Sequence, residues 1–134
     1  MIYLDSSAIV KLIKVEAESP ALRDWLNEQD EAPVTSVLAE VEVPRALRRS
    51  GPAHLAAMPS VLARISRIDM DSHVRATAAA YATDSLRSLD AIHLATAEML
   101  VAAERRVSAF VTYDKRQAAV VEAVGIPVEM PGRG

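Results

Sequence analysis

The segment Ile2-Tyr3-Leu4-Asp5-Ser6-Ser7-Ala8 opens the chain with a change of pattern that decides how the fold begins. Its first three residues are apolar, and the Asp-Ser-Ser that follows consists of residue types that cap helix N-termini. Ile9, Leu12 and Ile13 then recur at helical spacing. We therefore predict a strand that runs directly into a helix, with Asp5 at the carboxyl end of the strand.

The same alternation of short apolar runs and helical patterns continues along the chain. Strands are predicted at residues 32–35, 68–70, 109–112 and 127–129. Helices are predicted at residues 20–27, 54–66, 71–82 and 115–124, and two more after the N-caps Ser36 and Ser88. Because parallel strands need crossover helices, this order predicts an α/β fold. We expect one domain over residues 1–134, with a central parallel sheet of four to five short strands flanked by helices.

The composition of the chain limits the chemistry that it can carry. The 134 residues include no cysteine, which excludes disulfides, thiolate zinc sites and cysteine nucleophiles. No apolar run reaches the roughly 20 residues that a membrane span needs, and no basic leader precedes an apolar run at the N-terminus. We therefore expect a cytoplasmic protein.

The net charge of −3 does not by itself indicate a nucleic-acid partner. The basic residues are clustered, but each cluster alone is explained as solvated helix surface. A metal held by acidic residues would also supply the positive charge that a phosphate needs. Net charge therefore leaves a nucleic-acid partner open.

The acidic residues are more informative, because several fall where parallel sheets place their ligands. Asp5 and Asp114 each follow a predicted strand, and Asp90 lies in the first turn of a very apolar helix. Each of them alone is equally well explained as a cap or a partner of the helix dipole. Together they would repel one another unless a cation lay between them. All-oxygen ligands favour Mg²⁺ or Mn²⁺, which hold phosphates and activate water, so the pattern points to phosphodiester cleavage.

Four segments in order resemble the PIN domains, and in particular the VapC toxins of bacterial toxin–antitoxin pairs. They are residues 2–8, residues 36–49, Arg87-Ser88-Leu89-Asp90-Ala91-Ile92-His93-Leu94-Ala95, and Phe110-Val111-Thr112-Tyr113-Asp114. The resemblance covers essentially the whole chain. It implies a catalytic, metal-binding acid in each segment: Asp5, Glu42, Asp90 and Asp114.

Two glutamates compete for the second of these positions. In similar sequences the glutamate lies six residues after a serine and precedes an Arg-Ala-Leu-Arg-like run, as Glu42 does after Ser36. Glu40 is two residues away, and a helix turns the two to nearly opposite faces. We therefore assign Glu42 to the site and keep Glu40 as the alternative.

Other residues in these segments are expected to support the acids. Ser6 is expected to orient Asp5 or a metal-bound water, and Thr112 is expected in a similar role, although β-propensity alone also explains it. We interpret His93 as a packed or hydrogen-bonded helix residue. For Arg87 three roles are open: contact with RNA, an ion pair that steadies the acids, or a solvated position with no partner.

The resemblance implies an endoribonuclease toxin that uses Mg²⁺ or Mn²⁺, a VapB-like antitoxin that blocks its site, and a homodimer. Basic residues at the rim are expected to hold RNA phosphates: Arg45, Arg48, Arg49 and Lys115. A housekeeping RNA-processing nuclease and a non-catalytic PIN-like binding module are the alternatives. A phosphate-switch receiver lacks support because Asp5 is followed by two serines, and a haloacid-type phosphatase would need Asp where Ser7 stands.

Overall fold

The computed structural model describes residues 1–133 and has a five-stranded sheet at its centre. All strand pairs are parallel, in the order β3-β2-β1-β4-β5. The strands are β1 (Ile2–Leu4), β2 (Pro33–Ser36), β3 (Ser66–Ile68), β4 (Ala109–Val111) and β5 (Val128–Glu129). The predicted parallel α/β sheet is thus confirmed. The strand order reverses between β1 and β4, and ligands of such sheets bind outside the carboxyl ends of the strands at that point.

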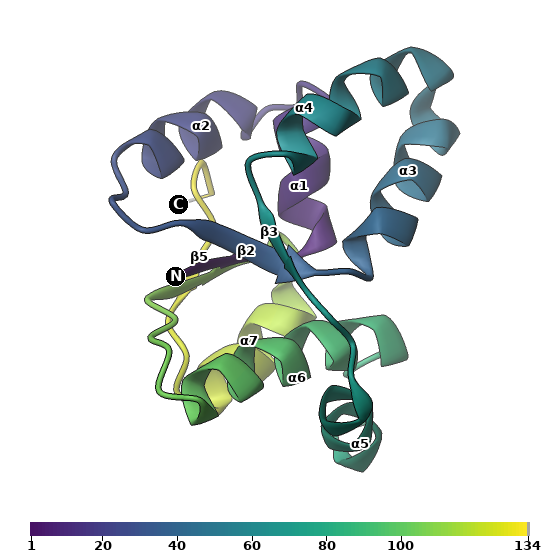
Figure 1. Cartoon of the computed structure of the whole chain (residues 1–134). Coiled ribbons are helices and arrows are strands. Elements are labelled where there is room, and N and C mark those ends of the chain that lie inside the picture. The colour runs from purple at the N-terminus through teal and green to yellow at the C-terminus, as the bar shows by residue number, and fades with distance from the viewer. Residues whose placement is uncertain (134) are drawn as a thin grey trace.

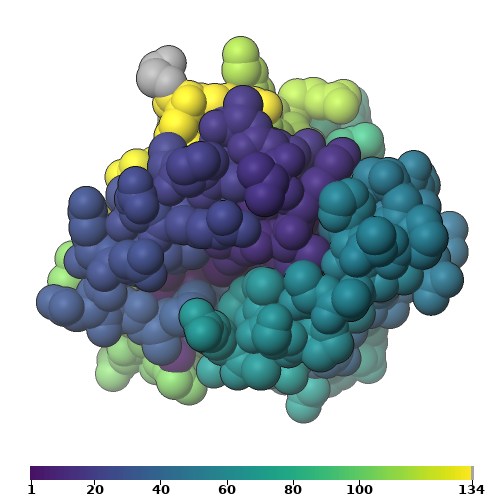
Figure 2. Space-filling view, turned by 90° about the horizontal axis from the view of Figure 1, so that it is seen from above, coloured from purple at the N-terminus to yellow at the C-terminus, as the bar shows by residue number. Residues whose placement is uncertain are grey.

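Helices cover both faces of the sheet, as Figure 1 shows. Above it in that view lie α1 (Ser6–Ile13), α2 (Ser19–Asn27), α3 (Ala39–Ser50), the 3₁₀ helix η1 (Pro52–Ala57) and α4 (Met58–Leu62). Below it lie α5 (Ser72–Ala80), α6 (Ser88–Ala102) and α7 (Lys115–Ala123). Seen from above, α1 emerges between α2 and the α3–α4 segment, which together form the upper surface (Figure 2). Within residues 1–133, no helix is long and apolar enough to cross a membrane.

Alternation along β1 supplies both halves of the core. Ile2 and Leu4 belong to the apolar cluster that includes residues of α1 and α3, while Tyr3 belongs to the cluster that includes residues of α6 and α7. Successive strand residues point to opposite faces, so three residues are enough to anchor both helical layers. All three are at most 1% exposed. Tyr3 stacks on Phe110 of β4, with the ring centroids 4.8 Å apart.

The two serines predicted as helix caps have other roles. Ser36 is the last residue of β2 and pairs with Ile68, and its Oγ accepts the N–H of Leu38 at 3.1 Å. Consequently α3 begins only at Ala39, without a side-chain cap. Ser88 is already helical, and the capping position is Arg87. Both cap predictions were wrong. Pairing with β3 keeps Ser36 in the strand, and the loop before α6 places the start of that helix at Ser88.

The helix predicted at residues 54–66 was also wrong in extent. A 3₁₀ helix is followed by the short α4, in which Pro59 has no N–H to continue the preceding turn. The chain then enters β3 at Ser66, which pairs with Val34. Asp71, in contrast, caps α5 as predicted, with its side chain accepting the N–H of Val74 at 2.9 Å.

The C-terminal residues hold the turn between β4 and α7. Arg133 donates from Nη1 to the Tyr113 carbonyl oxygen at 2.8 Å and from Nε to Glu18 Oε2 at 2.9 Å. The Tyr113 hydroxyl donates to the Pro131 carbonyl oxygen at 2.7 Å. These contacts tie the turn that carries Asp114 to α2 and to the end of the chain.

Candidate active site

Asp5 lies at the carboxyl end of β1 and caps α1. Its Oδ1 accepts the Ala8 N–H at 3.1 Å and the Ser7 hydroxyl at 2.6 Å, and the residue is 3% exposed. Burial raises the pKa of Asp5, partly offset by the charge of His93 and by the Ser7 hydroxyl. The Ser7 Oγ also accepts the Tyr113 N–H at 3.0 Å, so one hydroxyl links the first helix to the end of β4.

Glu42 faces the start of α1 from the first half of α3. Its Oε1 accepts the Ser6 hydroxyl at 2.6 Å and lies 2.7 Å from His93 Nε2. Burial tends to raise the pKa of Glu42, but the hydrogen bond and charge of His93 and the Ser6 hydroxyl lower it overall. Glu40 points elsewhere and pairs with Arg67 at 3.0 Å. The predicted separation of the two glutamates onto different faces is therefore seen.

Asp90 and Asp114 approach each other from α6 and from the start of α7. Asp114 caps α7 through Oδ1, which accepts the N–H groups of Arg116 and Gln117 at 2.9 and 3.3 Å. Burial, and next the charge of Asp114, raise the pKa of Asp90. Arg87 bridges the pair: its Nη2 lies 3.2 Å from Asp114 Oδ2 and its Nε lies 3.5 Å from Asp90 Oδ2.

The four acids thus gather at one edge of the sheet, but at least one carboxylate oxygen of each already contacts a protein donor. Within residues 1–133, no three His, Asp or Glu side chains are arranged so that they could hold a metal ion. The guanidinium of Arg87 instead supplies the positive charge between two of the carboxylates. The chemistry of the four side chains nevertheless suits a hard divalent cation, because their ligand atoms are all carboxylate oxygens. The cationic guanidinium of Arg87 already lies beside two of them.

The supporting residues differ in part from those expected. Ser6 contacts Glu42, and it is Ser7 that orients Asp5, so Ser6 does not orient Asp5, and its alternative role toward a metal-bound water stays a prediction. Thr112 is fully buried, and its Oγ1 accepts the Asp114 N–H at 3.1 Å. His93 is hydrogen-bonded as expected, but its contact with Glu42 was missed. The only sequence signal for it was its place three residues after Asp90, on the same face of the helix.

Two cavities flank Ser7, which lines both. One, of about 590 Å³, is also lined by Asp114, Lys115 and Arg116, and the other, of about 330 Å³, by Glu42, Arg45, Arg49 and Leu89. Three of the four basic residues expected to hold RNA therefore border the acids. Arg48 lines neither of these cavities and is exposed on α3.

An α/β sheet with acids gathered at its carboxyl edge is the arrangement expected of a PIN domain, and the model of the PIN domain family matches residues 2–123. This chain belongs to the PIN domain family. It is 51% identical to Ribonuclease VapC35 of Mycobacterium tuberculosis over 99% of this chain and 98% of that protein. Ribonuclease VapC46 of the same species is 42% identical, over 97% of each chain. The predicted family and ribonuclease class are thereby confirmed.

Solved structures agree on the fold. M. tuberculosis VapC20, a Sarcin-Ricin loop cleaving toxin, superposes with a TM-score of 0.73 at 16% identity, over 98% of this chain and 99% of that one. A toxin–antitoxin complex from Klebsiella pneumoniae gives a TM-score of 0.69 at 20% identity, over 98% of each chain. At these identities the likeness extends to the fold alone.

Proposed function

We propose that this protein is a VapC-type toxin of a type II toxin–antitoxin pair, an endoribonuclease that cleaves RNA phosphodiester bonds with the help of Mg²⁺ or Mn²⁺. The observation that carries the proposal is the convergence of Asp5, Glu42, Asp90 and Asp114 from four elements on one edge of the sheet. The high identity to proteins named as VapC ribonucleases along their whole length supports the reaction class.

The metal would be held by Asp5, Asp90 and Asp114, with Glu42 completing the set directly or through water. When bound, it would lower the pKa of an attacking water and offset the charge that develops on the phosphate. The protein's own part is to orient two of these carboxylates through hydrogen bonds. The Ser7 hydroxyl and the Ala8 N–H fix Asp5, and the backbone at the start of α7 fixes Asp114.

RNA phosphates would lie along the two cavities on either side of Ser7. Lys115 lines one and Arg45 and Arg49 line the other, so an RNA strand that ran through both would meet basic residues in each. Arg48 is proposed as an outer contact, since it lies on the same helix. The cytoplasm, where such RNA is found, is the location that we expect.

We also propose a VapB-like antitoxin as partner, which blocks the acids with a basic residue. The ion pairs of Arg87 with Asp90 and Asp114 support this, because a guanidinium already fits between these carboxylates. A homodimer is proposed from the family resemblance.

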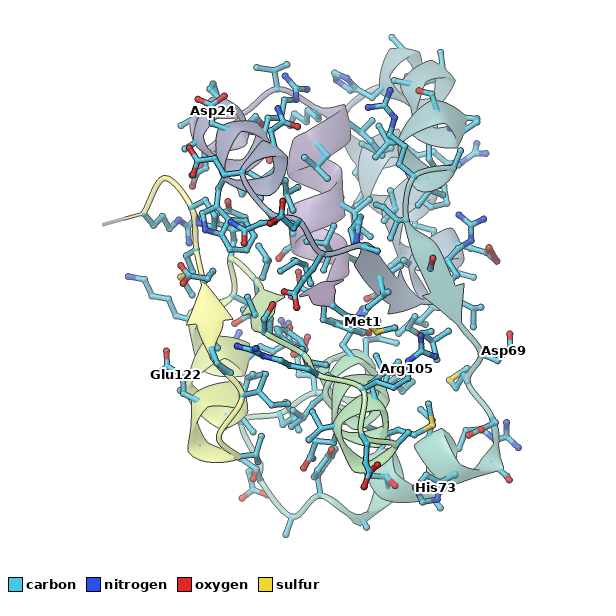
Figure 3. All side chains as sticks on the ribbon, turned by 60° about the vertical axis from the view of Figure 1, so that its left-hand side comes forward. Met1, Asp24, Asp69, His73, Arg105 and Glu122 are labelled. Carbon is cyan, nitrogen blue, oxygen red and sulfur yellow. The ribbon has the colours of Figure 1, made fainter. Side chains whose placement is uncertain are left out.

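The decisive experiment measures cleavage of a fluorescent single-stranded RNA with Mn²⁺, with Mg²⁺ and with EDTA. Asp5→Asn and Asp90→Asn should each lower the rate by at least about 100-fold, since even groups behind metal ligands contribute about 10- to 100-fold. Asp24→Asn is the matched control, because Asp24 is an exposed residue of α2 (Figure 3), a helix that carries none of the four acids.

A second pair of variants tests the assignment on α3. Glu42→Gln should abolish cleavage while Glu40→Gln, the same change two residues away, should leave it intact. Wild-type cleavage rates in both Asp5→Asn and Asp90→Asn, or equal rates in EDTA and Mn²⁺, would contradict the proposed function.

A further inference from the structure

A buried chain of hydrogen bonds leads from the middle of β1 to Glu42. The Tyr3 hydroxyl lies 2.7 Å from His93 Nδ1, and His93 Nε2 lies 2.7 Å from Glu42 Oε1. Tyr3 is fully buried, His93 is 2% exposed and the side chain of Glu42 is 20% exposed. The chain therefore starts in the core and ends at the candidate active site.

The hydrogens in this chain can be assigned from the chemistry of its members. An ionised carboxylate only accepts, so His93 Nε2 must carry the hydrogen that it donates to Glu42. In the neutral ring Nδ1 is then an acceptor, and the group that faces it is the Tyr3 hydroxyl, which donates. The opposite tautomer would turn the bare Nε2 lone pair toward the carboxylate.

Packing keeps the first member of the chain in place. The Tyr3 ring is stacked on Phe110, and the His93 ring meets it edge-on, with centroids 5.8 Å apart and an interplanar angle of 76°. A phenol held in this way cannot move its hydroxyl without repacking the core. Glu42, in contrast, is a flexible side chain at the rim of a cavity. The rigid end thus restrains the mobile one.

We propose that the Glu42 carboxylate selects the His93 tautomer with its hydrogen on Nε2, that the Tyr3 hydroxyl holds this ring in place by donating to Nδ1, and that Tyr3 and His93 are positioning residues for the Glu42 carboxylate in the active site. The inference rests on the proposed function only for the role of Glu42. The tautomer of His93 is independent of any activity.

The first test reads the tautomer directly, by ¹⁵N NMR of the imidazole nitrogens in the metal-free protein at pH 8. The wild type should give a protonated Nε2 and an unprotonated Nδ1. Tyr3→Phe, which keeps the ring and removes the hydroxyl, should leave the hydrogen on Nε2 and shift the resonance of Nδ1, because Nδ1 loses its hydrogen-bond donor. Tyr81→Phe is the matched control, because the Tyr81 hydroxyl donates to Glu98 away from the site. A hydrogen on Nδ1 alone in the wild type, or an unshifted Nδ1 resonance in Tyr3→Phe, would overturn the proposal.

The second test measures Mn²⁺ affinity by calorimetry. Tyr3→Phe should weaken binding by about 10- to 100-fold, the usual effect of losing a group behind a metal ligand, while Tyr81→Phe should not. His93→Gln keeps an N–H donor in reach of Glu42 and should bind better than His93→Leu. Equal affinity of these two variants would refute the positioning role. If instead Asp5→Asn retained cleavage while the NMR pattern held, the proposed function would fail and the tautomer assignment would stand.

Discussion

Arg87 illustrates how a single cationic side chain can occupy the place of a metal ion. It reaches Asp90 and Asp114 from the capping position of α6, and burial together with the charge of Asp114 raises the pKa of Asp90. The side chain of Arg87 is 64% exposed, so the ion pairs are screened by water and easily exchanged. A metal and Arg87 would compete for the same oxygens.

Removing this competitor should therefore strengthen metal binding. Arg87→Ala is expected to raise the Mn²⁺ affinity several-fold in a calorimetric titration. The metal-free variant should lose no more than about 1 kcal/mol of stability, because exposed ion pairs contribute about 0.2–1 kcal/mol. Arg67→Ala, which removes the ion pair with Glu40, is the control and should leave the affinity unchanged. A weaker affinity in Arg87→Ala would mean that Arg87 assists the metal instead.

Among the elements, α3 has to present Glu42 although its sequence is poorly suited to a helix. Pro44 lies inside it and has no N–H for the carbonyl of Glu40. The helix nevertheless runs from Ala39 to Ser50, because Val43 and Leu47 are fully buried in the core beside α1. Packing thus overrides the local preference.

Pro44→Ala should accordingly stabilise the protein. A proline inside a helix costs about 3 kcal/mol, whereas its stiffening of the unfolded chain returns only about 0.4–1 kcal/mol, so a net gain of about 2–2.6 kcal/mol is expected in urea denaturation. Pro20→Ala is the control: Pro20 is the second residue of α2, where the N–H has no helical partner. No gain, or a loss, from Pro44→Ala would show that the proline fits a distorted helix.

At the scale of the whole molecule, the partly buried acids make the free energy of unfolding depend on pH. Burial raises the pKa of Asp5, and burial together with the charge of Asp114 raises that of Asp90. The folded protein therefore binds these protons more tightly than the unfolded chain does. In EDTA, this contribution to the free energy of unfolding falls as the pH rises from the ordinary carboxyl pKa through the raised values, and above them the loss is complete.

Asp90→Asn removes one such contribution. The variant should be more stable than the wild type at pH 8 in EDTA, and the difference should shrink as the pH falls toward 4. Comparing the two proteins cancels the opposite contribution of Glu42, whose pKa is lowered. Urea unfolding over this pH range measures the difference, with Asp24→Asn as the control for a lost charge. A difference that grows toward acid pH would mean that the folded state does not raise the pKa of Asp90.

Several features could be predicted because they depend on short stretches of chain. An apolar run followed by Asp and two serines specifies a strand and a capped helix wherever it occurs, so Asp5 was correctly located at the end of β1. Thr112 and Asp114 follow from the same reasoning at β4. The separation of Glu42 from Glu40 onto different faces needed only the helical repeat, whereas the choice of Glu42 came from the family resemblance.

The sequence by itself thus determined the alternation of strands and helices, the parallel sheet and the edge at which the acids gather, because local pattern and chain direction dictate these. Only the tertiary structure decided that Ser7 accepts the Tyr113 N–H, that Arg87 joins Asp90 to Asp114, and that His93 connects Tyr3 to Glu42. The longer of these contacts join residues of different elements, whose meeting depends on how helices pack against the sheet. Hydrogen-bond partners follow from that packing, and no spacing within one segment encodes it.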